Sequence, residues 1–160
     1  MGGKPRQPLE LSEVQRRFEG RAKDADNWFS VAAWPDGRVQ EGVPDYVLEI
    51  TPRAEYVNTH LMDEYNRLRF IYNFERREQR LFLFSRVEYT YPDRPGYMIP
   101  PASSVIERVS FKPDGYMRRR LNDKSQSSIE EWEYRDVDLT DNWEVLPEFG
   151  SWGHLGRYRG

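Results

Sequence analysis

The sequence predicts a mainly antiparallel β protein of the α+β class, with a strongly curved sheet or open barrel of about seven or eight strands and one N-terminal helix. Three observations support this prediction. Apolar and polar residues alternate along most of the chain after residue 27. Turn signals, including Pro-Asp-Gly at 35–37 and again at 113–115, separate these segments. Helical spacing of apolar residues precedes them near the N-terminus.

At 160 residues the chain has the usual size of one domain. Residues 1–9 are rich in proline and glycine and show no periodicity, so we expect a disordered tail there and one domain over 10–160. A glycine-rich C-terminal arm begins at about residue 150. The many aromatic side chains bury large areas and make a small core sufficient.

The expected helix runs from about Glu13 to Lys23 and lies across the sheet. Ser12 and Gln15 have the spacing of an N-cap residue and its capping-box partner. One helical face carries the apolar residues Leu11, Val14 and Phe18.

The expected strands begin with a hairpin that turns at Pro35-Asp36-Gly37, and most of them alternate clearly. Segment 53–63 fits either a helical turn or a strand, and we favour strand or loop. Segments 68–74 and 81–91, joined by a polar turn at 75–79, form the expected centre of the sheet. The strands are expected at 28–34, 38–42, 45–50, 68–74, 81–91, 105–111, 116–121 and 129–134.

Two details of this prediction concern side-chain placement. In 81–91 one face is expected to carry Leu81, Leu83, Val87, Tyr89 and Tyr91, with Phe82 and Phe84 on the other. Four prolines and a glycine make 92–104 a loop, and its apolar residues Tyr97, Met98 and Ile99 could pack down as a flap.

Cysteine is absent, which excludes disulfides, thiolate metal sites and a cysteine nucleophile, and which fits a reducing compartment. No apolar run approaches the roughly 18 residues that a membrane span needs. We therefore expect a cytoplasmic protein that does not bind membranes.

No set of residues points to catalysis or to a cofactor. His60 lies close to Asp63 and Glu64, but zinc needs further ligands at a recognised spacing. Ser151 and His154 do not have the Gly-x-Ser-x-Gly spacing of a hydrolase elbow. With 27 acidic residues, chance pairs of carboxylates are expected. We predict no metal, no cofactor and no enzymatic activity.

Nucleic acid is not an expected partner. The net charge is −3, whereas phosphate binding depends on a positive field over the contact face. The consecutive arginines at 118–120 would point to alternate faces of a strand.

The C-terminal third combines negative charge with aromatic residues. Segment 129–150 holds eight acidic residues and one basic residue, a net charge of −7. Such a segment suits binding to a basic protein surface, because charge speeds encounter and aromatic side chains anchor the complex. The alternative is that Trp132, Trp143 and Trp152 belong to the core and that the acidic residues only keep the protein in solution. Composition does not separate the two.

The glycine-rich arm, Gly150-Ser151-Trp152-Gly153-His154-Leu155-Gly156, leaves a similar choice. Trp152, Leu155 and Tyr158 can dock it on the body of the domain. It can instead reach into a partner, and both readings stay open.

Four runs in this region carry a resemblance to a known family: Phe111-Lys112-Pro113-Asp114-Gly115, Tyr134-Arg135-Asp136-Val137-Asp138, Asn142-Trp143-Glu144 and 147–152. They resemble small actinobacterial immunity proteins paired with secreted toxins, a family that includes the immunity factor of the tuberculosis necrotizing toxin, an NAD glycohydrolase. The resemblance covers roughly the last third of the chain and involves no catalytic signature. It implies a cytoplasmic inhibitor that docks on a toxin domain and blocks its active site.

The sequence therefore supports an immunity-type protein that is monomeric when free and binds a cognate protein toxin. The alternative is a curved-sheet or barrel domain that holds a small ligand without catalysis, with 97–99 as its lid. The candidate partner-binding residues are Asp136, Asp138, Trp143, Glu144, Glu148, Trp152 and His154.

Overall fold

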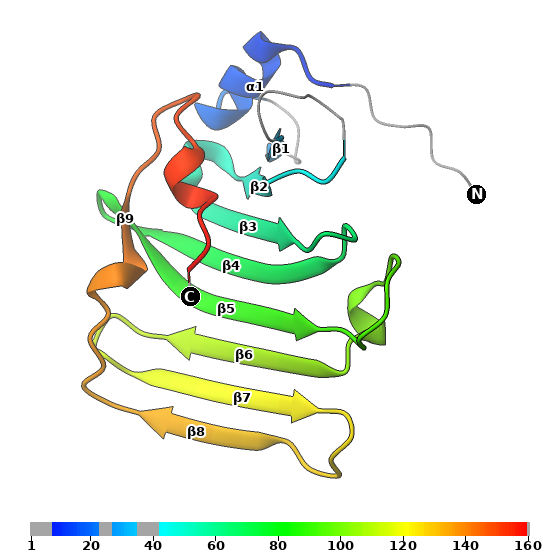
Figure 1. Ribbon diagram of the computed structural model, residues 1–160. Helices are drawn as coiled ribbons and strands as arrows, with labels where there is room; N and C mark the ends of the chain where they lie inside the picture. The colour runs from blue at the N-terminus through cyan, green and yellow to red at the C-terminus, as the bar shows by residue number, and fades with distance from the viewer. Residues whose placement is uncertain (1–7, 23–26, 35–41, 160) are drawn as a thin grey trace.

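The computed structural model describes residues 8–22, 27–34 and 42–159. In this part of the chain one antiparallel sheet runs in sequence order from β1 to β8, with β9 added beside β5, and one α-helix precedes it (Figure 1). The sheet is curved and does not close into a barrel. The strands are β1 (Phe29–Ala33), β2 (Tyr46–Ile50), β3 (Tyr56–Met62), β4 (Leu68–Arg77), β5 (Arg80–Thr90), β6 (Val105–Phe111), β7 (Met117–Asp123), β8 (Glu130–Tyr134) and β9 (Trp143–Val145).

The predicted fold class is confirmed, and the alternation in the sequence is its cause. Strands β4 to β8 follow their predicted segments to within a few residues, and the undecided segment 53–63 forms β3. The Pro-Asp-Gly turn between β6 and β7 is present, with Gly115 at φ +93° and its N–H donating to the Lys112 carbonyl oxygen. β9 is a strand that the sequence did not predict.

The N-terminal helix α1 (Leu11–Phe18) is shorter than predicted. Its N-cap residue is Glu10, and no side chain caps it, so the predicted capping box at Ser12 is wrong. Val14 and Phe18 pack on the core, whereas Leu11 is 71% exposed. The chain leaves the helix through Gly20, which has a φ of +71°.

The strand predicted to return after β1 falls mostly on 35–41, outside the described residues, as does the Pro-Asp-Gly turn before it. Within the described part, β1 pairs with β2, and Ala33 lies opposite Tyr46. The predicted tail, residues 1–9, also lies largely outside the described residues, which begin at residue 8.

A β-bulge at Phe84 changes which side chains share a face of β5. Asn73 pairs with Ser85, but the next residue, Phe74, pairs with Leu83, so Phe84 is the extra residue. Leu81 and Leu83 therefore lie on one face, and Val87 and Tyr89 lie on the other. The prediction that all four share one face is wrong, because one extra residue inverts the alternation.

We call the face that carries Phe70, Tyr72 and Phe74 the core face and the opposite one the outer face. Buried side chains from β1 to β5 form one hydrophobic cluster on the core face. α1 and the C-terminal segment, which returns from β8 past β9 toward β4, cover this half of the sheet (Figure 1). α1 and the C-terminal segment thus pack on the core face, while Phe82, Val87 and Tyr89 are buried on the outer face.

Loop 92–104 does not form the predicted apolar flap. Tyr97 is 70% exposed and Ile99 is 51% exposed. Ser103 is buried instead, and its hydroxyl donates to the Pro100 carbonyl oxygen at 2.6 Å. The loop is therefore organised by backbone contacts within a short 3-10 turn at Pro100–Ala102 rather than by apolar packing.

Candidate partner-binding groove

A row of side chains crosses the outer face at one end of the sheet. Tyr56 of β3 lies opposite Glu75 of β4, which lies opposite Phe82 of β5, which in turn lies opposite Trp143 of β9. Directly paired residues point to the same side of a sheet, so the four side chains stand in line. Phe82 is fully buried in the row and Tyr56 is 54% exposed.

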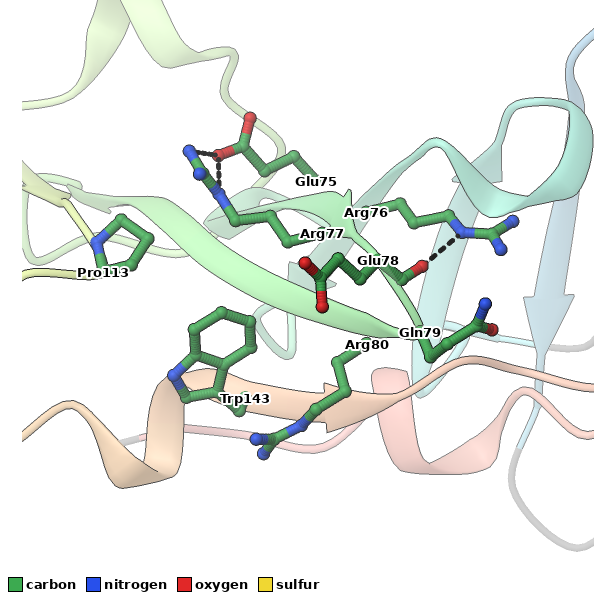
Figure 2. Close-up of a pocket in the computed structure, with 8 residues that line it drawn as sticks. All are labelled: Glu75, Arg76, Arg77, Glu78, Gln79, Arg80, Pro113 and Trp143. Atoms are coloured by element: carbon green, nitrogen blue, oxygen red, sulfur yellow. Dashed lines mark hydrogen bonds and ion pairs between the residues drawn. The ribbon is translucent and has the colours of Figure 1, made fainter.

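An open groove of about 730 Å³ is lined by two residues of this row, Glu75 and Trp143 (Figure 2). The β4–β5 hairpin forms one wall, while Pro113 and Trp143 come from other parts of the chain. A second hollow adjoins it and shares Arg80, Pro113 and Trp143. We call the two hollows together the Trp143 groove. Its lining residues are 75–80, 113–115, 136–140 and Trp143.

Trp143 is the half-buried aromatic centre of this groove. Its ring centroid is 4.8 Å from that of Phe82, and the Arg80 guanidinium carbon lies 4.9 Å from the Trp143 ring centroid. Both contacts favour one orientation of the indole, because its ring packs on Phe82 at an interplanar angle of 50° and the cation is attracted to the ring face.

Charges of both signs border the Trp143 groove. Arg77 is held by Glu75 at 2.7 Å, so this pair is internally neutralised. Among the residues that the structure describes, no carboxylate lies within ion-pair distance of Arg80. Within the same residues, no basic side chain lies within ion-pair distance of the exposed Asp136. The Arg80 cation and the Asp136 anion, which line the same hollow as Trp143, are thus available to a partner.

The loop that carries Asp136 and Asp138 is fixed against the β6–β7 turn. The Val137 N–H donates to the Gly115 carbonyl oxygen at 3.0 Å, and a Cβ on Gly115 would lie 3.3 Å from the Val137 carbonyl oxygen. Asp138 accepts hydrogen bonds from the N–H and hydroxyl of Thr140. These hydrogen bonds to the ionised form lower the pKa of Asp138.

Asn142 lies at the junction where β9 and β6 pair with successive parts of β5. β6 pairs with β5 from Ser85 onward, and β9 pairs with it up to Phe82. Between them the Leu83 carbonyl oxygen accepts a 3.0 Å hydrogen bond from the buried Asn142 side chain. The amide replaces the missing ladder bond and positions Trp143.

Glu144 is an internal ion-pair residue rather than a surface acid. Its carboxylate is bound by Arg157 at 2.8 Å and by the buried Arg159. Burial raises the pKa of Glu144, but the hydrogen bonds and charges of the two arginines outweigh it, and the pKa lies below its ordinary value. Arg159 also lies 4.9 Å from the Phe74 ring centroid.

Trp152 lies in the core, and we remove it from the candidate surface. It is 9% exposed, and its ring centroid is 5.4 Å from that of Phe18 and 5.9 Å from that of Phe29. Leu155 next to it is fully buried, and the Thr59 hydroxyl donates to its carbonyl oxygen at 2.7 Å. The arm is therefore docked, as the first of the two readings had it.

Gly156 allows this docking. A Cβ atom at this position would overlap the ring of Tyr46, whereas Gly153 has open space around it. Beyond it, the hydroxyl of the buried Tyr72 accepts from the Arg159 N–H at 3.0 Å and lies 3.2 Å from its carbonyl oxygen. Burial raises the pKa of Tyr72.

The remaining two candidate residues lie apart from the groove lining. His154 is half-buried, and its Nε2 lies 3.0 Å from the Val145 carbonyl oxygen, which can only accept, so Nε2 carries the proton. Glu148 is exposed and has no side-chain partner within the described part of the chain. The structure therefore brings together Asp136, Asp138 and Trp143 of the seven predicted residues and adds Arg80, which the sequence argument missed.

The negative charge of 129–150 does not form one patch. Glu131 is bound by Arg118 at 2.8 Å, and Glu133 accepts from the Tyr116 hydroxyl at 3.0 Å. With Glu144 and Asp138 also engaged, half of the eight acidic residues have partners within the protein. The acids without such partners in the described structure are Glu130, Asp136, Asp141 and Glu148.

Within the described residues, no group of three or more histidine and carboxylate side chains could hold a metal ion. In the same part of the chain, no helix is both long and apolar enough to cross a bilayer. Burial lowers the pKa of His60, and the nearby charge of Glu49 opposes this shift. His60 pairs across the sheet with Val47 and Ile71 rather than with an acid.

Comparisons of the chain with protein-family models, with curated proteins and with solved structures found no match.

Proposed function

We propose that the protein is a cytoplasmic immunity-type inhibitor that binds a cognate toxin domain through the Trp143 groove and covers its active site. It acts by occlusion, is monomeric when free and carries out no reaction itself. The toxin class that the sequence resemblance suggests is an NAD glycohydrolase.

The observation that carries this proposal is the arrangement around Trp143. An aromatic side chain that packs on Phe82 and Arg80 in an open groove, with Asp136 in the lining of the same groove, has the features of an interface anchor. Arg80 and Asp136 can each pair with a partner charge that complements it, which favours one docking orientation. No conformational change is needed, because the indole is already positioned.

A protein partner fits this surface better than a small ligand does. The hollows are open, and their lining is dominated by charged and polar side chains. A small-ligand site is usually enclosed and mostly apolar. The core-face interior of β1 to β5 is filled by large side chains, including Phe29, Tyr72 and Phe74 at 2% exposure or less. The alternative of a ligand-holding barrel therefore has little support.

The direct test is co-expression with the product of the adjacent gene in a bacterial host. We expect growth to be restored, cellular NAD⁺ to be preserved and a stable complex to be purified. Absence of a complex together with continued toxicity would refute the proposal. If the complex forms but the free toxin does not consume NAD⁺, the inhibitor role would stand. The assignment of the toxin as an NAD glycohydrolase would then be wrong.

Three variants test the surface. Trp143→Ala should weaken the complex by at least about 30-fold, because anchoring aromatics cost about 2 kcal/mol or more when truncated. Arg80→Glu and Asp136→Asn should each weaken it about tenfold. Asn tolerates the positive φ of 56° at position 136, so this change removes charge without straining the loop. Tyr97→Ala, on the exposed loop 92–104, is the matched control and should bind normally.

A further inference from the structure

A second, smaller pocket lies on the outer face over β2 and β3. It has a volume of about 230 Å³ and is lined by Trp28, Glu49, Thr51, Tyr56 and Asn58. Glu49 and Asn58 are direct cross-strand partners, so their side chains stand next to each other on this face.

The two aromatic walls of this pocket are unusually open to solvent. Trp28 is 38% exposed and Tyr56 is 54% exposed. Large aromatic side chains on a strand are normally buried by neighbours, so two of them bordering one hollow provide binding surface. Val57, the neighbour of Tyr56 in β3, is fully buried on the core face, so Tyr56 points to the outer face. Trp28 directly precedes β1 and lines the same pocket.

Glu49 supplies a negative charge that the described part of the chain does not neutralise. No arginine, lysine or histidine there lies within ion-pair distance of its carboxylate. Burial lowers the pKa of the nearby His60, which disfavours its charged form and so opposes neutralisation of Glu49 by this imidazole. The neighbouring Thr51 hydroxyl is already bonded to the backbone of Tyr56.

We propose that this pocket binds a hydrogen-bonding organic cation, namely the guanidinium or primary ammonium head of a ligand. The cation would lie against the faces of Trp28 and Tyr56, which attract positive charge. Its N–H groups would donate to the Glu49 carboxylate and to the Asn58 side-chain oxygen. The volume suits one such head group and excludes a nucleotide or a folded element. This site goes beyond the proposed function and does not depend on it.

The pocket adjoins the Trp143 groove through one residue pair. Tyr56 forms a wall of the pocket, and its cross-strand partner Glu75 lines the groove. A basic side chain of a protein that occupies the groove could therefore reach the pocket. A free small cation has the same chemistry, and the test separates the two sources.

The test is an NMR titration of the ¹⁵N-labelled full chain with three probes. They are the peptide acetyl-Gly-Arg-Gly-amide, the same peptide with citrulline in place of arginine, and agmatine, a free small guanidinium compound. We expect saturable binding of the arginine peptide or agmatine on the order of 1 mM. Shifts should centre on the amides of Glu49, Tyr56 and Asn58 and on the Trp28 indole. Citrulline has nearly the same shape without the charge, so its peptide should bind at least about tenfold more weakly.

Glu49→Gln should weaken binding of the cationic probe about tenfold, and Tyr56→Ala about fivefold, while Tyr97→Ala should leave it unchanged. Tighter binding of the peptide than of agmatine supports a protein partner, and the reverse supports a small metabolite. Equal binding of the arginine and citrulline peptides, shifts centred elsewhere, or no saturation with either cation would overturn the proposal. The shift map for the unaltered chain keeps the test valid even if a variant fails to fold.

Discussion

The C-terminal third of the chain contains two consecutive regions, each with a tryptophan and acidic residues, that end in opposite environments. Residues 136–143 border an open groove, with Trp143 half-exposed and Asp136 without a charged partner in the described structure. Residues 144–159 dock on the core face, with Trp152 buried and Glu144 tied to two arginines. The difference teaches that tryptophan and carboxylate side chains have no fixed role here. Where the chain crosses the hydrophobic face of the sheet, these side chains stabilise the fold. Where it runs along the edge of the sheet, they remain available for binding.

Replacing the two tryptophans should give the largest difference in the free energy of unfolding. Trp152→Ala removes a buried side chain that contacts three other aromatic rings, and we expect it to lower the free energy of unfolding by about 3–5 kcal/mol. Trp143→Ala should cost only about 1 kcal/mol, since it loses one ring contact and one cation–π contact at a half-exposed site. Urea unfolding followed by circular dichroism measures both. Equal losses would contradict the assignment of one residue to the core and the other to the groove.

The acidic residues give a second, smaller contrast. Glu144→Gln leaves the buried Arg159 without its charged partner, and we expect a loss of about 3 kcal/mol. Glu148→Gln makes the same chemical change at an exposed position and should leave the unfolding midpoint unchanged. Denaturant titrations of the two variants side by side test this. If Glu144→Gln left the free energy of unfolding unchanged, the arm would dock through apolar contacts alone.

Substitutions at two glycines of the arm are also expected to differ in their effect on stability. Gly156→Ala places a Cβ against the Tyr46 ring and should cost about 1–3 kcal/mol. Gly153→Ala has open space and should change stability by no more than about 0.5 kcal/mol. Thermal unfolding of both variants provides the measurement. If Gly153→Ala were the more harmful of the two, the docking of the arm on β2 would be wrong.

The smallest effect is the acid dependence of the arm. Because the pKa of Glu144 is lower in the folded protein than its unfolded value of 4.5, its stabilisation is complete above pH 4.5 and is lost as the pH falls through the folded pKa. Stability measured from pH 6 down to pH 3 should therefore fall less steeply in Glu144→Gln than in the unaltered protein. Parallel curves would assign the acid sensitivity to other carboxylates, such as Asp63, whose pKa is also lowered.

The failures of prediction have local physical causes. The inversion of faces in β5 arises from the single extra residue Phe84, which no periodicity reveals, because a bulge depends on pairing with β4. Arg80 was missed because it looks like an ordinary turn residue until β9 brings Trp143 beside it. β9 itself is only three residues long and is made by pairing rather than by propensity.

The sequence by itself determined most strand positions and the antiparallel class, because period-two alternation and turn residues act over a few neighbouring positions. Only the tertiary structure decided which aromatic and acidic residues reach solvent. Trp143 and Trp152 stand nine residues apart, Trp143 between Asn142 and Glu144 and Trp152 between Ser151 and Gly153, and neither set of neighbours predicts burial. Burial depends on which surface the returning chain meets, and for residues 144–159 that surface is built by β1 to β5, far away in the sequence.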